Sequence, residues 1–315
     1  TGSTFTTTYA VYTSPTQHAG TYTGQVAYAL IHGSGDEPTP IYIMQDVANW
    51  KDSLQLEDNV QALDIRDGKQ YWITKLADGH IWMTQNLDFD IKANTTLNSN
   101  TTDLNVAYDS STGQYAEYND GYAESNGVIY YTPASAATTI DFTGTTATGW
   151  QNSNTVPYTA NKTDDTSTGH NSLGNYYNWT AAIASNNSSS LTQNTLNDIS
   201  KNPKNSICPK GWRLPTISNQ SETLAGSTNE FGRLNYLYNT IGGTNSDYLK
   251  QNPLLFVKGG RLSPYLSYYL GDGYYWASTV NGVSNSYNLY FENGVNQTSN
   301  QRHRGWGFSI RCVVK

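Results

Sequence analysis

Two cysteines are the residues of this chain whose chemistry could be most specific. Cys208 and Cys312 lie far apart, and they are the only cysteines in the sequence. They can pair as one disulfide or stay as two separate buried thiols. No Cys-x-x-Cys motif or Cys/His cluster occurs, so the spacing does not indicate a metal or redox centre. A bridge between them would stabilise the fold by roughly 4–5 kcal/mol in the chain-entropy model.

The ionisable residues show no catalytic motif. The five histidines are scattered without metal-ligand spacing, and no Gly-x-Ser-x-Gly sequence occurs. Asp88 and Asp90 fall on one side of a strand, which would suit a Ca²⁺ site or a glycosidase pair. Paired acids on an edge strand more often serve solubility. The sequence therefore predicts no enzyme activity, no metal and no other cofactor.

A polar C-terminal stretch, residues 274–310, has the composition of a binding surface. Strand alternation divides the segment 286–292 between two faces. The apolar face, typical of a core-facing side, comprises Tyr287, Leu289 and Phe291. The other face comprises Asn288, Tyr290 and Glu292. Tyrosine offers a large amphipathic contact area and asparagine offers adaptable hydrogen bonds, so this second face could contact a ligand.

The polar run 296–304 and Trp306 extend this surface. We expect the run to be too hydrophilic for burial, with a solvated turn as the alternative interpretation. Trp306 lies between two glycines, where it could anchor a ligand or pack against loops. The predicted ligand-binding residues are Asn288, Tyr290, Glu292, Asn296, Gln297, Asn300, His303 and Trp306. All of them except Glu292 are expected to be exposed and close together on one surface.

Composition limits the possible partners. Only 14% of residues are charged, the net charge is −7, and 25 tyrosines and 8 tryptophans are present. No basic cluster is available to neutralise phosphates, so nucleic-acid binding is not expected. No apolar stretch is long enough to insert into a membrane, and no signal peptide is visible. The chain is expected to be a fragment of a longer extracellular or cell-surface protein.

Three regions are predicted along the chain. Residues 1–35 alternate like β-strands and are either an edge hairpin or the end of an upstream β domain. Residues 36–62 have linker composition. Residues 63–315 form the main domain, which begins with a hairpin whose strands, 70–76 and 80–87, flank Asp78-Gly79.

The main domain mixes strands and helices without regular alternation. Residues 92–170 are expected to be long loops, and 176–184 a short helix. Residues 228–241 show a helical apolar stripe, and Ser227 and Glu230 have capping-box spacing. The remaining predicted strands are 254–257, 274–278, 287–291 and 307–314. Because strands and helices do not alternate, the predicted class is α+β, with long loop insertions.

Five segments together resemble a known family. They are Leu63–Trp72, Trp82–Leu87, Cys208–Thr216, Gly273–Thr279 and Gly307–Val313. This combination is similar to the Fibrobacter succinogenes major paralogous domain, which is related to the C-type lectin and formylglycine-generating-enzyme folds. The resemblance implies a C-type-lectin-like domain over 63–315 and favours a Cys208–Cys312 bridge. It also implies that Trp82, Trp212 and Trp276 are core residues.

The resemblance extends to the variable proteins of diversity-generating retroelements, whose C-terminal stretch is rewritten at adenine-containing codons. Asparagines recur throughout 274–310, among tyrosine, serine and histidine, which are products of mutating an asparagine codon. The predicted function is surface-displayed adhesion to a protein or glycan ligand on another cell or virus. The alternatives are a formylglycine-generating-type enzyme, a carbohydrate hydrolase and a structural cell-envelope module. Typical Ca²⁺-lectin motifs are missing from the sequence, so Ca²⁺-dependent sugar binding is not predicted.

Overall fold

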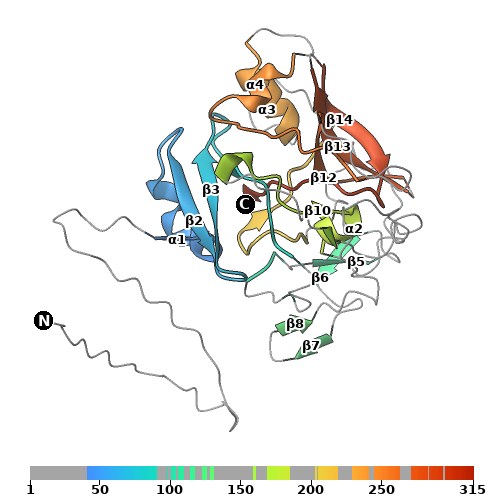
Figure 1. Cartoon of the computed structure of the whole chain (residues 1–315). Coiled ribbons are helices and arrows are strands. Elements are labelled where there is room, and N and C mark those ends of the chain that lie inside the picture. The colour runs from blue at the N-terminus through green and yellow to red at the C-terminus, as the bar shows by residue number, and fades with distance from the viewer. Residues whose placement is uncertain are drawn as a thin grey trace, which may run out of the picture. The chain divides into compact units, whose positions relative to one another are not determined.

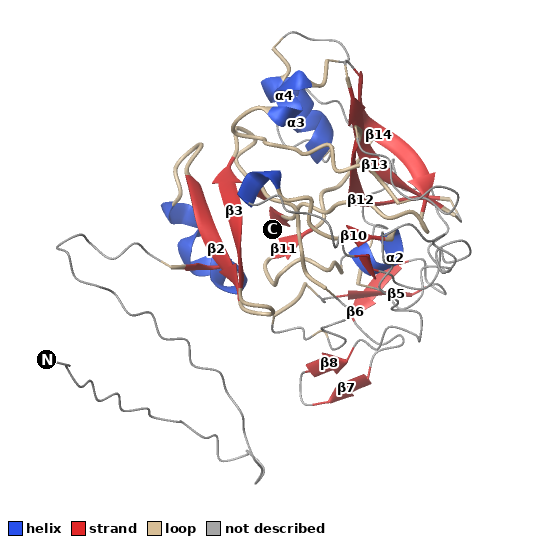
Figure 2. Cartoon of the chain, viewed as in Figure 1, coloured by secondary structure: helices blue, strands red, loops and turns tan. Residues whose placement is uncertain are grey.

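The chain divides into two units, Thr1–Pro40 and Ile41–Lys315. All residues described by the computed structural model belong to the second unit (Figures 1 and 2). The expected N-terminal strands therefore lie outside the described residues. The described residues are 41–90, 97, 101–103, 106–109, 114–117, 123–125, 128–130, 159–160, 169–184, 203, 205–218, 229–240, 245–262, 271–282, 284–293 and 295–315.

A six-stranded sheet brings together strands that are distant in sequence (Figure 1). Its order is β1-β2-β3-β4-β15-β11, with β1 parallel to β2 and all other neighbours antiparallel. Its strands are β1 (Tyr42–Ile43), β2 (Asn59–Asp64), β3 (Lys69–Lys75), β4 (Ile81–Met83), β11 (Trp212–Arg213) and β15 (Val313–Val314). Because β15 lies between β4 and β11, the sheet is complete only when the last strand returns to it.

The predicted hairpin around Asp78-Gly79 is confirmed as β3 and β4. Gly79 has a φ of 87°, which glycine adopts without steric cost. Asp78 fixes the turn by accepting hydrogen bonds from the His80 backbone N–H at 3.0 Å and the Trp82 indole N–H at 2.9 Å.

Residues 41–62, most of the expected linker 36–62, are part of the folded unit. They form β1, the 3₁₀ helix η1 (Met44–Asp46), α1 (Val47–Trp50), the 3₁₀ helix η2 (Lys51–Ser53) and most of β2. Met44, Val47 and Leu54 are buried in the core. One-turn helices are too short to show a periodic apolar pattern, so the sequence alone did not reveal them.

A second, three-stranded sheet carries most of the predicted binding stretch. It consists of β12 (Gly273–Asn281), β13 (Asn285–Glu292) and β14 (Val295–His303), and it confirms the expected strands 274–278 and 287–291. The polar run 296–304 is mostly strand β14, and not a turn. The predicted apolar face of β13, which comprises Tyr287, Leu289 and Phe291, packs in one buried cluster with Phe231 and Leu234 of α3.

The helix predicted over 228–241 is α3 (Glu230–Tyr238). Its N-cap is Asn229, whose side-chain oxygen accepts from the Gly232 N–H at 2.9 Å, so the predicted capping box is wrong. Glu230 instead holds Arg213 through two contacts of 2.6 Å. The other helices are η3 (Gly169–Asn171), α2 (Trp179–Ala182), which is part of the expected helix 176–184, and α4 (Asp247–Lys250).

Two predicted strands differ from the structure. Residues 254–257 form a turn and an irregular segment, where Arg311 donates to the Leu254 carbonyl at 2.6 Å and the Tyr275 hydroxyl bonds to Val257. These side chains supply the hydrogen bonds that a strand ladder would otherwise make. In 307–314 only β15 is a strand, preceded by isolated bridges at Gly307, Phe308 and Ser309.

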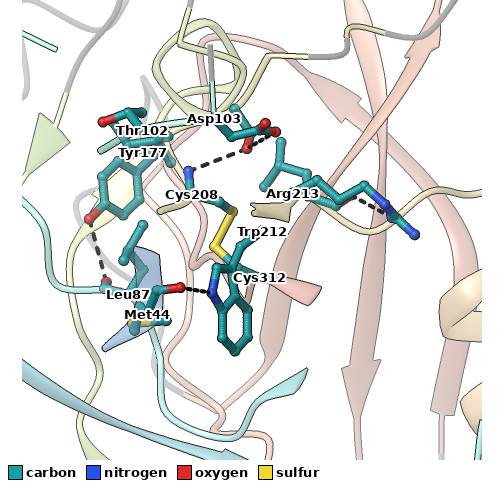
Figure 3. Close-up of a disulfide and its surroundings, with 12 residues drawn as sticks. Met44, Leu87, Thr102, Asp103, Tyr177, Cys208, Trp212, Arg213 and Cys312 are labelled. Atoms are coloured by element: carbon teal, nitrogen blue, oxygen red, sulfur yellow. Dashed lines mark hydrogen bonds between the residues drawn. A yellow bond between two sulfur atoms is a disulfide. The ribbon is translucent and has the colours of Figure 1, made fainter. Parts of the chain in front are cut away.

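The cysteines form a disulfide with Cα atoms 5.8 Å apart, and both residues are fully buried (Figure 3). Cys208 precedes β11 and Cys312 precedes β15, so the bridge fastens this antiparallel strand pair. Trp82, Trp212 and Trp276 are at most 1% exposed, which confirms their predicted core role. Trp212 donates its indole N–H to the Met44 carbonyl at 2.8 Å (Figure 3).

Three two-stranded ladders complete the described elements. They comprise β5 (Val106–Asp109) with β6 (Gln114–Glu117), β7 (Ala123–Ser125) with β8 (Val128–Tyr130), and β9 (Thr159–Ala160) with β10 (Tyr176–Tyr177). Several therefore fall within the expected loop region 92–170. The described residues thus combine mainly antiparallel sheets with few, short helices, which is an α+β arrangement.

Candidate functional site

Strand pairing brings several of the predicted site residues together. In the β13–β14 ladder, Asn288 pairs with Asn300, Tyr290 with Gln297, and Asn285 with His303. Paired residues in an antiparallel ladder point to the same face. Asn296 pairs with Phe291, and its side chain lies outside the described residues.

Two of the predicted site residues are buried, contrary to expectation. Asn288 is 0% and Asn300 9% exposed. The Asn288 amide N–H₂ donates to the Asn300 carbonyl at 3.2 Å, and the Asn300 amide N–H₂ donates to the Gln297 side-chain oxygen. These hydrogen bonds satisfy the two amide N–H₂ groups, whereas both side-chain oxygens are buried without a hydrogen-bond partner among the described residues. Gln297 is exposed, whereas Tyr290, Glu292, His303 and Trp306 are half-buried.

Arg304 shows most clearly that the polar run is not simply solvated. Its side chain is fully buried and lies over the Trp179 ring, 4.6 Å from the centroid. Its guanidinium donates to the Asn285 carbonyl, the Ser286 hydroxyl and the Gly282 carbonyl at 2.8–3.1 Å. No local sequence pattern predicts this role, because burial of an arginine depends on acceptors that only the folded chain supplies.

An aromatic cluster lies beside these asparagines. The Tyr290 and Tyr274 ring centroids are 4.8 Å apart, and Tyr274 stacks on Phe308, also at 4.8 Å. Trp306 meets Phe308 edge-on at 6.3 Å. Tyr274 and Phe308 are buried, but Tyr290 and Trp306 are only partly covered. The two half-exposed rings thus rest on a rigid aromatic base, which limits the rotamer freedom they could lose on binding.

Two arginines converge on these rings. The Arg261 guanidinium carbon lies 4.7 Å from the Trp306 centroid, and that of Arg302 lies 5.9 Å from it. Arg302 is also 5.9 Å from the Tyr290 centroid, and Arg261 donates to the Tyr274 hydroxyl at 2.5 Å. Such distances allow cation–π attraction. We call Arg261, Tyr274, Tyr290, Arg302 and Trp306 the arginine–aromatic cluster.

Burial and nearby charges shift the pKa values of the ionisable groups in and beside this cluster. Burial raises the pKa of Tyr274, and the positive charges of Arg261 and Arg302 oppose that shift. Burial and a hydrogen bond with Glu292 raise the pKa of Tyr290. Burial, followed by the Glu292 charge, raises the pKa of Asp272. Both phenols therefore stay protonated at neutral pH and serve as hydrogen-bonding groups.

His303 is held in a turn at the edge of the cluster. Its Nδ1 accepts from the Gly305 N–H at 3.1 Å, and the Trp306 N–H donates to the His303 carbonyl at 3.0 Å. Burial and the charge of Arg304 lower the His303 pKa. A neutral imidazole with Nδ1 accepting carries its proton on Nε2. This turn fixes the backbone that presents Trp306.

Sequence reasoning missed Arg261, Tyr274 and Arg302 as site members. Tyr274 shares a face with Tyr290 because the two residues are cross-strand partners. Arg302 falls within the polar run, and strand parity on β14 would have revealed it had the run been recognised as a strand. Arg261 lies outside the predicted binding stretch 274–310, and no local sequence pattern indicated that it belongs to this surface.

Other candidate chemistry is less well supported. Asp88 is ion-paired to Lys69 at 2.6 Å, so it is not a free partner for Asp90. Within the described residues, no group of three His, Cys, Asp or Glu side chains could hold a metal ion.

A cavity of about 160 Å³ is lined by Lys51, Asp52, Lys75, Gly79, His80, Ile81, Val314 and Lys315. Its charges are largely balanced, because Asp52 also lines it and His80 and Lys315 are paired with Asp78 and Asp103.

Comparison with protein-family models, with curated proteins and with solved structures found no match to this chain. In the part of the chain that the structure describes, no helix is long and apolar enough to cross a membrane.

Proposed function

We propose that this chain is an extracellular, surface-displayed binding protein whose contact surface is the arginine–aromatic cluster together with Gln297 and His303. The observation that carries the proposal is the placement of half-exposed Tyr290 and Trp306 beside two arginines on a rigid sheet. Tryptophan, tyrosine and arginine are the residues that most often dominate binding energy at protein interfaces. Catalysis is supported less, since both cysteines are held in the disulfide and carry no thiol.

The proposed fold is a C-type-lectin-like domain, on the motif resemblance alone. A buried disulfide supports an oxidising, extracellular location, because such bonds are rare in the cytosol. The proposal includes diversification of the C-terminal stretch by a retroelement, at half-exposed or exposed positions such as Tyr290 and Gln297. A reverse transcriptase gene beside a near-copy of the last coding segment would support diversification, and its absence would argue against it.

The binding proposal is tested with a Trp306→Ala variant. Fluorescently labelled protein would be titrated onto panels of bacterial cells, phage particles and immobilised glycans. The target that is bound with the highest affinity would then be used to compare the variants. We expect Trp306→Ala to weaken binding to that target at least about tenfold, because it removes a central aromatic contact. Tyr236→Ala is the matched control, since Tyr236 is an aromatic residue of α3 that is 52% exposed. Equal binding by wild type and Trp306→Ala, at unchanged thermal midpoints, would reject the surface.

A further inference from the structure

One face of the β2–β3 hairpin packs on the core, and the opposite face carries uncharged side chains (Figure 1 shows the two strands side by side). Ala62, Tyr71 and Ile73 belong to the packed face and are buried. The opposite face comprises Asn59, Gln61 and Leu63 of β2 and Gln70, Trp72 and Thr74 of β3. Trp72 is half-exposed and lies in neither hydrophobic core cluster, so core packing does not account for an aromatic ring here.

His170 supports the indole of Trp72. The two rings are stacked, with centroids 4.9 Å apart and planes 25° apart. The His170 Nδ1 donates to the Thr84 carbonyl at 3.1 Å, so Nε2 accepts from the Asn59 amide at 3.2 Å. Asn59 in turn accepts from the Thr74 hydroxyl at 3.1 Å. Both nitrogens of the imidazole are thus fixed, and the ring stacked on it has a preset orientation.

The hydrogen bonds of His170 also indicate which face of the indole is open. His170 is bonded to Asn59, the cross-strand partner of Thr74, so the imidazole covers Trp72 from the Thr74 side. Side chains at alternate positions of a strand share a face. The opposite face of the indole is therefore directed toward Gln70, which is exposed.

The polar groups around this ring are uncharged. Gln61 is the cross-strand partner of Trp72 and is exposed, like Gln70. Within the described part of the chain, the two glutamine side chains and the Trp72 indole N–H make no hydrogen bond. Burial lowers the pKa of His170, and the charge of buried Arg311 adds to this shift, so the imidazole is neutral at pH 7. Each glutamine amide can both donate and accept.

These properties suit a neutral sugar. A pyranose ring presents C–H groups on its faces and hydroxyl groups at its edge, so it can stack on an indole while amides bond its hydroxyls. A charged ligand would meet no opposite charge among the side chains of this face. Only Leu63 and Trp72 are apolar among them, whereas a protein interface has a larger apolar centre.

We propose that this face of β2 and β3 is a second binding site, which takes a neutral oligosaccharide with one pyranose ring stacked on Trp72 and its hydroxyls bonded to Gln61 and Gln70. The inference goes beyond the proposed function, because the site lies on the six-stranded sheet and shares no residue with the arginine–aromatic cluster.

The probes are cellohexaose and mannohexaose, titrated by calorimetry, with hexagalacturonate as an acidic sugar and polyproline as a peptide. We expect a neutral hexaose to bind best. Trp72→Ala should weaken its binding at least about tenfold, and Trp72→Phe less, because a smaller aromatic face remains. Gln61→Ala should weaken it about fivefold, the effect of one neutral hydrogen bond. Tyr236→Ala, which removes an aromatic ring that is 52% exposed, is the matched control and should bind like wild type.

Four results would overturn the sugar site. They are absence of binding by both neutral hexaoses, equal binding by wild type and Trp72→Ala, tighter binding of hexagalacturonate or polyproline, and a loss in Trp306→Ala as large as that in Trp72→Ala. The last result would locate the sugar on the arginine–aromatic cluster instead. Thermal midpoints show that each variant is folded. If Trp72→Ala is unstable, Trp72→Phe and Gln61→Ala decide the outcome.

Discussion

At the residue scale, two arginines separated by a single residue have opposite environments. Arg302 lies half-exposed beside the rings of Tyr290 and Trp306, whereas Arg304 is fully buried on Trp179. Arg304 satisfies its donors with acceptors of the β12–β13 turn, including the Gly282 carbonyl. The first side chain is therefore available to a partner, and the second holds the sheet together.

We expect Arg304→Met to destabilise the protein by about 3 kcal/mol, because it leaves several buried acceptors without a donor. Arg302→Met should change stability by no more than about 0.5 kcal/mol, as surface substitutions usually do. Urea unfolding followed by tryptophan fluorescence measures both. Comparable losses in the two variants would contradict the distinction between a structural and an exposed arginine.

Asp103 is a buried acid whose titration affects stability. Its side chain is 0% exposed, is paired with Lys315 and accepts from the Ser206 hydroxyl at 3.2 Å. Burial, opposed by Lys315, raises its pKa to about 6. Between an unfolded pKa near 3.8 and this value, the folded state binds more protons than the unfolded state. The contribution of Asp103 to stability therefore declines as pH rises through that window.

The Asp103→Asn variant tests whether the contribution of Asp103 to stability falls as the pH rises. The unfolding free energy of wild type minus that of the variant should fall by up to about 3 kcal/mol between pH 4 and pH 7. Chemical denaturation at several pH values gives this difference, and other titrating groups cancel between the two proteins. A difference that rises with pH would show that the Lys315 charge outweighs burial and that the pKa is depressed.

At the element scale, close packing between β12 and β13 fixes the sheet that carries the arginine–aromatic cluster. Gly273 begins β12 opposite Phe291, and a Cβ placed there would lie 2.0 Å from the Phe291 ring. No ordinary side chain fits that space unless the ring moves. Phe291 in turn packs edge-on to Phe256 at 6.3 Å, within the cluster that includes α3.

Gly273→Ala should therefore lower stability by about 1–3 kcal/mol through overpacking. In the Phe291→Leu background, the same change should cost less, because the smaller side chain leaves room for the new methyl group. A double-mutant cycle from thermal unfolding measures this coupling. Additive effects of the two substitutions would mean that the close approach of Gly273 to Phe291 is not what limits residue size.

At the scale of the whole molecule, the fold depends on contacts between residues distant in sequence. β15 joins β4 to β11, and the Cys208–Cys312 bridge lies beside this junction, with the Cys312 carbonyl accepting from the Met83 N–H at 2.9 Å. The bridge spans 104 residues. It therefore removes much of the conformational freedom of the unfolded chain.

Reduction of the bridge should lower the free energy of unfolding by about 4–5 kcal/mol. Denaturation with and without a phosphine reductant measures this loss. The double variant Cys208→Ala/Cys312→Ala is the control, since its stability should be low and insensitive to reductant. Two free thiols in the denatured, unreduced protein would show that the bridge does not form.

The sequence by itself determined those features that depend on local pattern. Alternation identified strands β12 and β13 and the apolar face of Tyr287, Leu289 and Phe291, while Asp78-Gly79 identified the β3–β4 hairpin. Helical periodicity located α3, because its stripe must face a core. These predictions are correct because the direction of the side chains repeats with a fixed period along a strand or a helix.

Only the tertiary structure decided which polar residues are buried and which are available for binding. Asn288 and Asn300 are buried where the pairing of β13 with β14 places them opposite each other. Arg304 is buried because Trp179 lies against it and the β12–β13 turn accepts its hydrogen bonds, whereas Arg302, two residues earlier, is half-exposed. Arg261 joins Trp306 across a long stretch of chain. Hydrophilicity indicates that a side chain needs hydrogen-bond partners, and water or the folded protein can supply them equally well. The arginine–aromatic cluster was therefore visible only once the strands had been paired.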